Sequence, residues 1–388
     1  MAATVWEETL RMIHRRNLLI ATAFAALLGI GNSAYAQQDP IRVGVLVGTS
    51  GASGQIGNWT NRGVEIAIEE LNEAAGFQRF SMFSEDSEYK AQKGLEGFNK
   101  LTNVDGIDVL ITSGSAVLPT IAPLADQREL VMMNVGAQSP AMAGIGKFTF
   151  SVIQLADFDI AVMANYAFDT LDFQRGAALY ISNDIGQTNV VEFERQFTQL
   201  GGEMVAIESF RASDTNYGPQ VAKIAAAQPD FVYLVGDVDV AAAATRQIKA
   251  LMPNVQILTY GGMESQLFLD AAGAAAEGLL YTQTDFDPSS DDPAIAAVAQ
   301  RYQTRYGEDF TSPFIGYAYD AMMVVAAALD AAGETGEPLR AAIMDRRDFP
   351  GITGDVVFRD DGTVSKSVII KGVRDGAFVL VDRVGASE

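Results

Sequence analysis

The chain of 388 residues has no cysteine and a single histidine. Without cysteine there is no cysteine nucleophile, and no cysteine that a lipid anchor requires. His14 lies in the N-terminal segment described below, so the rest of the chain has neither a Ser-His-Asp triad nor the usual zinc ligands. Carboxylate-only catalysis and an oxygen-ligand metal site stay formally open. We therefore predict no enzymatic activity, no cofactor and no metal.

Basic residues are also scarce. The chain has 27 Lys and Arg against 49 Asp and Glu, which gives a net charge of −22. Such a chain cannot bind nucleic acid by neutralising phosphates, and its self-repulsion favours solubility. The sequence also lacks a GxxxxGK[ST] phosphate loop and a DxDxDG calcium loop. These absences leave a small-molecule ligand as the expected partner, and no nucleic acid.

Long hydrophobic runs are rare as well. Residues 18–30 form an apolar run that follows Arg15 and Arg16 and precedes small residues ending at Ala36. This pattern predicts a secretory signal peptide over residues 1–36, cleaved after Ala36, so we expect a periplasmic protein. Export by the general secretory route and by the twin-arginine route both stay open. No later run is expected to span a membrane.

The most informative stretch that is present covers residues 108–119. Residues 108–111 read DVLI, a short run that is apolar and partly β-branched after Asp108, as in a strand that is buried on both faces. A Ser- and Gly-rich loop follows, and a helix is expected from about Leu118. The free N–H groups at a helix N-terminus suit a carboxylate or another small anion. The alternative is that Gly and Ser only serve a tight turn between strand and helix.

Two series of alternating strands and helices make up most of the chain. The pattern predicts doubly wound parallel sheets in two similar lobes, with ligands at the carboxyl ends of the strands. Later residues predict three helices and a β-rich tail. The expected strands cover residues 41–47, 80–83, 108–111, 130–133, 148–152, 176–181, 205–210, 230–235 and 255–260. The expected later elements are an extended stretch at 278–284, helices at 294–306, 314–332 and 338–347, and strands at 355–358, 366–371 and 378–382.

Several motifs occur together in an informative order. IRVGVLVGTSG at residues 41–51 precedes NRGVEIAIEELN at 61–72, DTNY at 214–217 precedes PDFV at 229–232, and GYAYDA follows at 316–321. In this arrangement the chain resembles the periplasmic solute-binding proteins of branched-chain amino acid ABC transporters, the leucine/isoleucine/valine-binding type. The resemblance covers the chain after the signal peptide.

The resemblance implies an α/β fold of two Rossmann-like lobes joined by a three-strand hinge, the type I periplasmic binding fold. The crossings would fall near Ile153, Gln283 and Val368. Lobe 1 would hold residues 37–153 and 284–367, and lobe 2 would hold residues 154–283 and 368–388.

The resemblance also implies a function. A monomer would capture a small carboxylate-bearing solute, an amino acid or a related acid or amide, by hinge closure. It would then deliver the solute to an ABC permease in the inner membrane. The alternative is a periplasmic sensing module that signals to a membrane receptor.

Two loops and one aromatic residue carry over from the family pattern. The resemblance places carboxylate-binding loops at Ser113-Gly114-Ser115 and at Gly136-Ala137-Gln138, both with free N–H groups. It also places Tyr319 in the lining of the cleft. Simple turn geometry for the second loop and core packing for Tyr319 are the alternatives. A bulky side chain at Gly114 is expected to block binding without unfolding the protein.

Other positions depart from the family pattern. Three positions that are aromatic in the family are Ile56, Ile185 and Asp237 here. Trp59 lies one helical turn after Ile56, and it either lines the site or belongs to the core.

The acidic residue that would pair with a ligand ammonium falls on Gly261. Asp237 or Glu264 would replace it, and if neither does, the ligand lacks an α-ammonium group.

Overall fold

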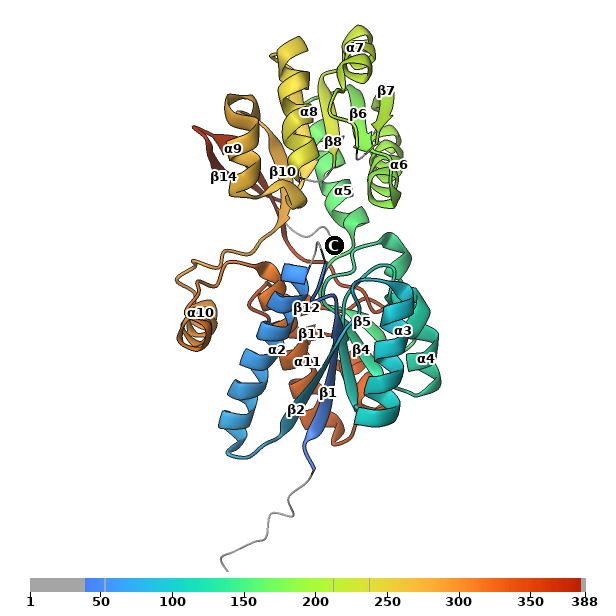
Figure 1. The fold of residues 1–388 in the computed structure, drawn as a ribbon, viewed down its shortest axis with the longest axis vertical. Helices are drawn as coiled ribbons and strands as arrows, with labels where there is room; N and C mark the ends of the chain where they lie inside the picture. Colours follow the sequence, from blue (N-terminus) through green and yellow to red (C-terminus); the bar gives the residue numbers. More distant parts are fainter. Residues whose placement is uncertain (1–38, 52–53, 212, 237, 385–388) are drawn as a thin grey trace, which may run out of the picture. The chain divides into compact units, whose positions relative to one another are not determined.

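The computed structural model describes residues 39–51, 54–211, 213–236 and 238–384, and residues 41–388 belong to one compact unit. The predicted signal peptide, its cleavage site after Ala36 and the side chain of Asp237 lie outside the described residues. Two larger sheets, each covered by helices on both faces, form the body of the described chain (Figure 1).

The first sheet is parallel throughout, with the strand order β2-β1-β3-β4-β5. Two of its three interior strands, β1 and β3, are apolar runs that are buried along most of their length, as predicted for strands covered on both faces. The strands are β1 (Ile41–Val47), β2 (Phe80–Asp86), β3 (Val109–Thr112), β4 (Val131–Asn134) and β5 (Thr149–Ser151).

Helices α2 and α11 cover one face of this sheet, and α3 and α4 cover the other (Figure 1). The apolar stripe of α2 is buried at Val64, Ala67 and Ile68, because residues three and four apart share a face. The helices are α2 (Gly54–Ala75), α3 (Ala91–Lys100), α4 (Leu118–Gln127), α10 (Pro293–Tyr306), α11 (Pro313–Ala332) and α12 (Glu337–Arg346), and the small hairpin is β11 (Asp348–Phe349) with β12 (Val356–Val357).

Helix α11 is the one later segment in the described chain that bears on the expectation that no run after the signal peptide spans a membrane. It has 20 residues and a mean hydropathy of 1.3, so by length and composition it is able to cross a membrane. In the fold, 72% of that window is buried, and the helix packs between α2 and α12. Its apolar character therefore belongs to the core of the first lobe.

The second sheet has the order β14-β13-β10-β9-β8-β6-β7. It is parallel from β10 to β7, and β13 and β14 join it antiparallel. Asp375 and Gly376, which connect these two strands, have φ of 52° and 72°, as a two-residue hairpin requires. The strands are β6 (Arg175–Ile181), β7 (Glu203–Phe210), β8 (Phe231–Val235), β9 (Gln256–Tyr260), β10 (Leu280–Thr284), β13 (Val368–Arg374) and β14 (Ala377–Val384).

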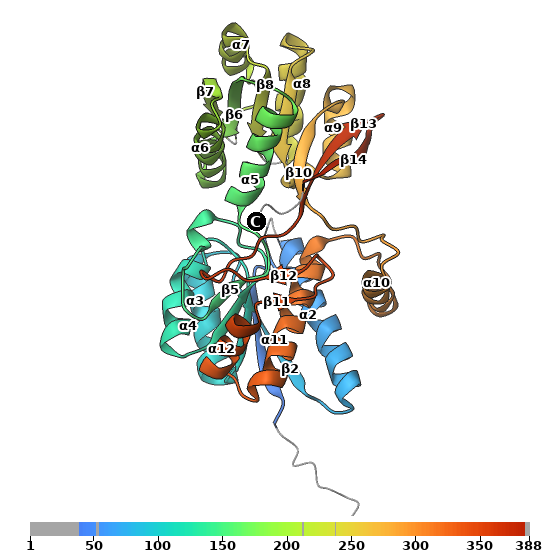
Figure 2. The ribbon, with the colours of Figure 1, turned by 180° about the vertical axis from the view of Figure 1, so that it is seen from behind.

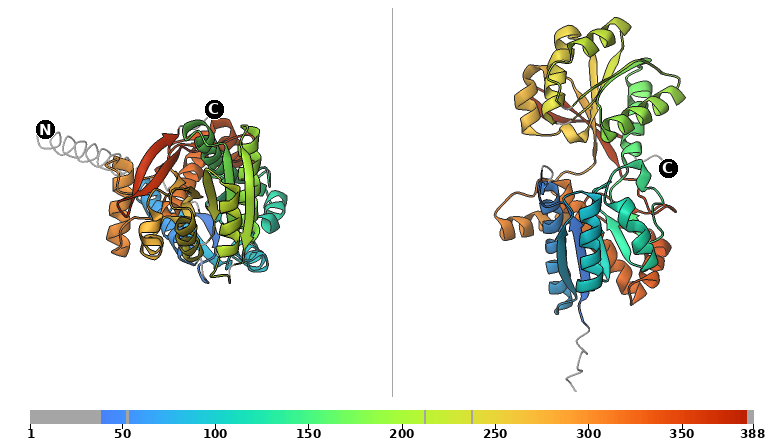
Figure 3. Two further views of the ribbon diagram at one scale, coloured as in Figure 1. Left: turned by 90° about the horizontal axis from the view of Figure 1, so that it is seen from above. Right: turned by 45° about the vertical axis from the view of Figure 1, so that its right-hand side comes forward.

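Helices α5 and α6 cover one face of the second sheet, and α7, α8 and α9 cover the other (Figures 2 and 3). Helix α9 was not predicted; it is short, and only the hydroxyl of Ser265, which caps its N-terminus, marks it. The helices are α5 (Ala156–Asn165), α6 (Asp184–Gln199), α7 (Gly218–Ala227), α8 (Val238–Leu251) and α9 (Gln266–Ala272). Short π or 3₁₀ turns are Leu101–Asp105, Pro140–Met142, Tyr166–Thr170, Gly261–Met263 and Gly273–Ala276.

The predicted α/β class with two lobes of parallel sheet is confirmed. The chain passes between the sheets after β5, after β10 and before β13, which gives three crossings. The exact lobe boundaries, residues 37–153 with 284–367 and residues 154–283 with 368–388, stay predictions.

Candidate ligand-binding pocket

A cavity of about 630 Å³ lies at the carboxyl ends of the parallel strands, with walls from both sheets. Its volume falls within the range of about 300–1,000 Å³ that is typical of small-molecule sites. The wall from the first lobe and the first crossing consists of Ser115, Ala116, Gly136, Gln138, Ser139, Pro140, Ile153, Pro313, Phe314 and Tyr317. The opposite wall consists of Ala156, Asp159, Ile160, Ile185, Thr188, Asn189, Tyr260, Gly261, Gly262, Thr282, Gln283 and Thr284.

The loop after β3 supplies hydrogen-bond donors to this cavity. The strand end is anchored because the buried Thr112 hydroxyl donates to the carbonyl of Leu46 at 2.8 Å. The N–H groups of Ser115 and Ala116 donate to no residue that the structure describes, and both residues are exposed at the cavity. They precede α4, so the positive end of a helix dipole adds to their attraction for an anion.

Gly114 is needed by the loop itself. Its φ is +112°, and a Cβ there would lie 2.9 Å from the ring of Tyr89. A bulky side chain at this position would therefore strain the backbone and the core. This corrects the expectation that a substitution at Gly114 blocks the site without unfolding, and Ala116 is the better position for a block.

The loop after β4 is built differently from the predicted anion site. The Asn134 side chain accepts hydrogen bonds from the N–H groups of Gly136 (3.2 Å) and Ala137 (2.8 Å), and it donates to the carbonyl of Ala137 at 2.7 Å. These N–H groups are thus occupied, which corrects the expectation that they are free. Ala137 is buried, whereas Gly136 and Gln138 do line the cavity.

The opposite wall is mainly uncharged. Asn189 is held in place because its amide donates to the carbonyl of Ile185 at 2.9 Å and its oxygen accepts from the Tyr233 hydroxyl at 3.3 Å. Ile185 lines the cavity, as the family pattern suggested, and its side chain is 57% exposed. This wall therefore offers apolar and amide surface.

Asp159 is the only charged residue among the described residues that line the cavity, and sequence reasoning missed it. Its Oδ1 accepts a hydrogen bond from the Gln154 amide at 3.1 Å. Burial raises the pKa of this carboxyl to about 7, although the Gln154 hydrogen bond acts in the opposite direction. The one available signal was its place on the first turn of the helix after β5.

A chain of buried hydrogen bonds links Asp159 to the crossings between the lobes. The Gln154 amide also donates to the Thr284 hydroxyl at 2.8 Å, and this hydroxyl accepts from Tyr317 at 2.7 Å. The ammonium of Lys366 lies 5.7 Å from the centre of the Tyr317 ring. Gln154, Thr284 and Lys366 belong to three different crossings, so the cavity wall and the hinge share one network.

Several predicted site residues lie elsewhere. Tyr319 packs in the core of the first lobe near Glu70, and Tyr317 lines the cavity in its place. Ser113 is buried beneath the loop, 2% exposed, and contacts Gly136 rather than the cavity. Trp59 packs against the core of the first lobe, and Ile56, like Trp59, is not a lining residue.

Glu264 is neutralised by its neighbours. It forms an ion pair with Lys371 and accepts a hydrogen bond from the Gln283 amide at 3.2 Å. It does not line the cavity, whereas Gly261 and Gln283 beside it do. Glu264 is therefore a poor candidate for pairing with a ligand ammonium, and Asp237 lies outside the described residues.

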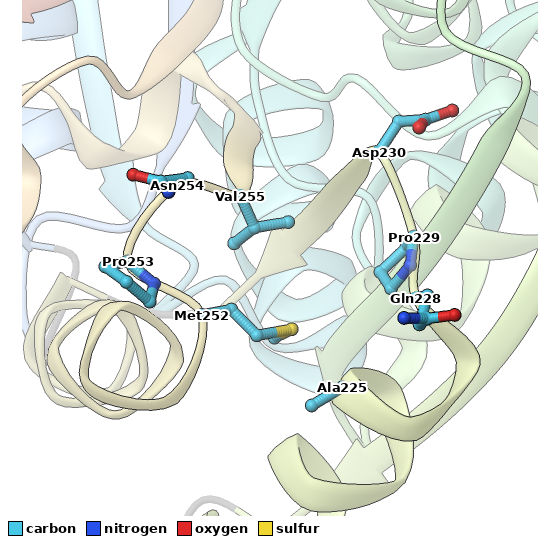
Figure 4. A pocket seen from close by; sticks show the side chains of 8 residues that line it. All are labelled: Ala225, Gln228, Pro229, Asp230, Met252, Pro253, Asn254 and Val255. Atoms are coloured by element: carbon cyan, nitrogen blue, oxygen red, sulfur yellow. The ribbon is translucent and has the colours of Figure 1, made fainter.

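A second, shallower cavity of about 350 Å³ lies at the other end of the second sheet (Figure 4). It is formed by the turns that precede β8 and β9, including Pro229, Asp230 and Pro253. The Asp230 carboxylate is already hydrogen-bonded, because it accepts from the N–H groups of Gln174 and Arg175. Ligands of parallel sheets bind at the opposite, carboxyl end, so this cavity is not the candidate site.

No metal centre emerges from the part of the chain that the structure describes. It contains no group of three or more acidic or histidine side chains placed to hold an ion.

Comparison with known proteins places the chain in a family. The family model described as periplasmic binding protein matches residues 40–377. Among curated relatives, a Leu/Ile/Val-binding protein homolog of Brucella abortus is 24% identical over 354 residues, covering 90% of this chain and 93% of the relative.

Two solved structures illustrate the similarity of fold. The leucine-binding protein LivK of Thermotoga maritima has a TM-score of 0.76 at 23% identity, covering 89% of this chain and 99% of its own. A solute-binding protein of an ABC transporter from R. palustris, in complex with benzoate, has a TM-score of 0.72 at 20% identity, covering 89% of this chain and 97% of its own.

The chain belongs to the periplasmic binding proteins, and the relatives that it resembles include a Leu/Ile/Val-binding protein homolog and a leucine-binding protein. The relatives are named as binding proteins, which confirms the expectation that this chain is not an enzyme.

Proposed function

We propose that this protein captures a small carboxylate-bearing solute, an amino acid or a related acid, for an ABC importer. The observation that carries the proposal is the pair of N–H groups at Ser115 and Ala116, two lining residues just before α4 whose N–H groups donate to no residue that the structure describes. A carboxylate there would receive two hydrogen bonds and the favourable end of the helix dipole.

The remaining lining supports a partly apolar solute. Phe314 and Tyr317 meet edge to face with ring centroids 6.0 Å apart, and Ile153 and Ile160 add aliphatic surface. Such walls favour an aliphatic or aromatic body through burial of apolar area. The relatives named for leucine and the structure that holds benzoate fit the same description.

The cellular setting is part of the proposal. The signal peptide over residues 1–36 would direct the protein to the periplasm, where the loaded protein would meet an ABC permease of the inner membrane. Contacts from both walls would favour closure of the lobes around the solute. We expect a monomer with and without solute, which size-exclusion chromatography with light scattering measures.

The test is a thermal-shift screen of the chain from residue 37 onward, called the mature chain below. Aliphatic and aromatic amino acids, their deaminated acids and the corresponding amides are compared, and hits are titrated by calorimetry. A solute at about 100 times its dissociation constant adds roughly 2.7 kcal/mol of stability, a readily measured shift. Stabilisation by amides or amines but by no carboxylate would overturn the proposal.

A further inference from the structure

The charge of the cavity is concentrated in one side chain. Among the lining residues that the structure describes, Asp159 is the only one with a charge, and neither Arg nor Lys accompanies it. A lone carboxylate repels an anion and attracts a cation, most strongly where water is largely excluded. The N–H groups at Ser115 and Ala116 have the opposite preference. The cavity therefore carries one anion-attracting and one cation-attracting wall.

The Asp159 carboxyl group has spare acceptor capacity. Within the described chain its one hydrogen bond comes from Gln154, and an ionised carboxylate accepts about four. The other titratable groups that act on it are Asp157 on the same helix, Tyr233 on β8 and Tyr317 on α11. None of these is a cation, so this carboxyl group has no compensating charge among the described residues.

Two buried or half-buried acids elsewhere in the fold are already paired. Glu264 has Lys371, and Asp320 has Lys366 together with hydrogen bonds from residues 352 and 353. A buried acid that helps to hold a fold together is usually paired with a cation or fully hydrogen-bonded. Asp159 and its helix neighbour Asp157 form no ion pair among the described residues, and of these two acids only Asp159 lines the cavity.

We propose that Asp159 determines specificity by accepting hydrogen bonds from the protonated amine of a zwitterionic solute, an amino acid with an apolar side chain. The proposal rests on the proposed function, because it requires the carboxylate of that solute to bind at Ser115 and Ala116. It assigns the ammonium contact to Asp159, in place of Glu264 or Asp237. The aromatic and aliphatic lining then receives the side chain.

The protonation state of Asp159 gives a second measurable consequence of the proposal. The pKa of this carboxyl is raised to about 7 by burial, so the unliganded site holds a proton for part of the time at neutral pH. An ammonium group at hydrogen-bond distance stabilises the ionised form and lowers that pKa. Binding of an amino acid at pH 7 therefore releases a fraction of a proton, and a deaminated acid releases none.

The test uses matched ligand pairs on the mature chain. The pairs are leucine with 4-methylpentanoate, and phenylalanine with 3-phenylpropanoate, since the members of each pair differ only in the ammonium group. We expect the amino acid to bind at least about 10-fold more tightly than its deaminated partner, a factor that corresponds to one pKa unit of interaction. Asp159→Asn should reduce or reverse this preference. The control Asp157→Asn, on the same helix but outside the lining, should retain it.

Proton release is measured by titrating leucine and phenylalanine in phosphate and in Tris at pH 7. The binding enthalpy should depend on the buffer for the wild-type chain and not for Asp159→Asn.

The outcomes separate the two proposals. If deaminated acids bind as well as amino acids, or if Asp159→Asn leaves the preference and the proton release unchanged, Asp159 does not have this role and the proposed function stands. If no carboxylate in either pair binds the wild-type chain, both proposals fail for these solutes.

Discussion

Two carboxyl groups in this protein occupy opposite kinds of surroundings. Asp320, on α11 in the first lobe, is buried and accepts hydrogen bonds from the N–H groups of Ile352 (2.8 Å) and Thr353 (3.0 Å). The buried ammonium of Lys366 lies 3.8 Å away and also donates to the carbonyl and hydroxyl oxygens of Thr353. Asp159, on α5 at the cavity, accepts one hydrogen bond from the described residues.

This difference distinguishes an acid that stabilises the fold, Asp320, from an acid that is available at the cavity, Asp159. Asp320 ties α11 to the loop before β12 and, through Lys366, to the chain that enters the third crossing. Its removal would leave a buried ammonium without its counter-charge. Asp159 has no counter-charge to leave behind, so its removal costs the fold little. The same residue type is thus a structural requirement in one place and an unfilled acceptor in the other.

The largest expected effect is on the framework side. Asp320→Ala should lower the free energy of unfolding by about 3–5 kcal/mol, because Lys366 stays buried and unpaired. Urea unfolding of the mature chain measures it. The matched control is Asp330→Ala on the same helix, whose exposed pair with Arg79 is worth about 1 kcal/mol or less. If Asp320→Ala fails to fold, Asp320→Asn with Lys366→Met should recover a folded protein. Equal effects of the two alanine variants would contradict the contrast drawn here.

The next effect concerns the cavity alone. Ala116→Trp should weaken binding of the best solute by about 100-fold or more, roughly 2.7 kcal/mol, by filling the space before α4. The melting temperature of the unliganded protein should change little, because Ala116 is exposed. Calorimetry and thermal melting measure the two quantities. Ala297→Trp, on the exposed face of α10, is the control and should bind normally. Retained affinity in Ala116→Trp would place the site elsewhere.

A smaller effect is expected where the two regions meet. Gln154→Leu removes the donor to both Asp159 and Thr284, and should cost about 1–2 kcal/mol of stability. It should also weaken amino acid binding, because the lost hydrogen bond favoured the ionised form of Asp159. Urea unfolding and calorimetry test this. Gln138→Leu is the control. The Gln138 amide donates a single hydrogen bond, at 3.4 Å, so this variant should lower the stability less than Gln154→Leu does.

The smallest effect is a pH dependence of the unliganded protein. The native Asp159 carboxyl has its pKa raised to about 7, so below that pH it binds a proton that the unfolded chain releases near its ordinary pKa of about 3.9. Stability should therefore fall as pH rises, by at most about 1 kcal/mol between pH 6 and pH 7. Asp159→Asn should lack this contribution when urea unfolding is compared at the two pH values. An unchanged slope would show that Asp159 is ionised throughout.

Much of the fold was predictable because its signals are local. A short, β-branched apolar run such as residues 41–47 or 231–235 is typical of a strand covered on both faces, and the stripe of Val190, Phe193 and Phe197 is typical of the buried face of a helix. Alternation of such elements leaves few topologies for parallel sheets. The position of the site at the ends of the strands follows from the same rules.

The composition of the site was less predictable. Of the site residues named from the sequence, Ser115, Gly136, Gln138 and Ile185 line the candidate cavity. The sequence did not show that Asn134 occupies the N–H groups of the loop after β4, because a side-chain hydrogen bond to the backbone leaves no mark in a hydrophobic pattern. Nor did the sequence show that Tyr317, and not Tyr319, lines the cavity. Helix α11 is apolar and buried on nearly every side, so its pattern does not mark the side that faces the cavity.

By itself, the sequence determined the order of strands and helices, the two-lobed class and the absence of histidine and cysteine chemistry, because each depends on composition or on neighbours along the chain. Only the tertiary structure decided which donors are free and which acid is uncompensated. The bond from Gln154 to Thr284 joins residues 130 positions apart, and Lys366 meets Asp320 from a different crossing. Partners so distant in sequence are brought together by folding alone, and they determine whether a carboxyl group is part of the framework or available to a ligand.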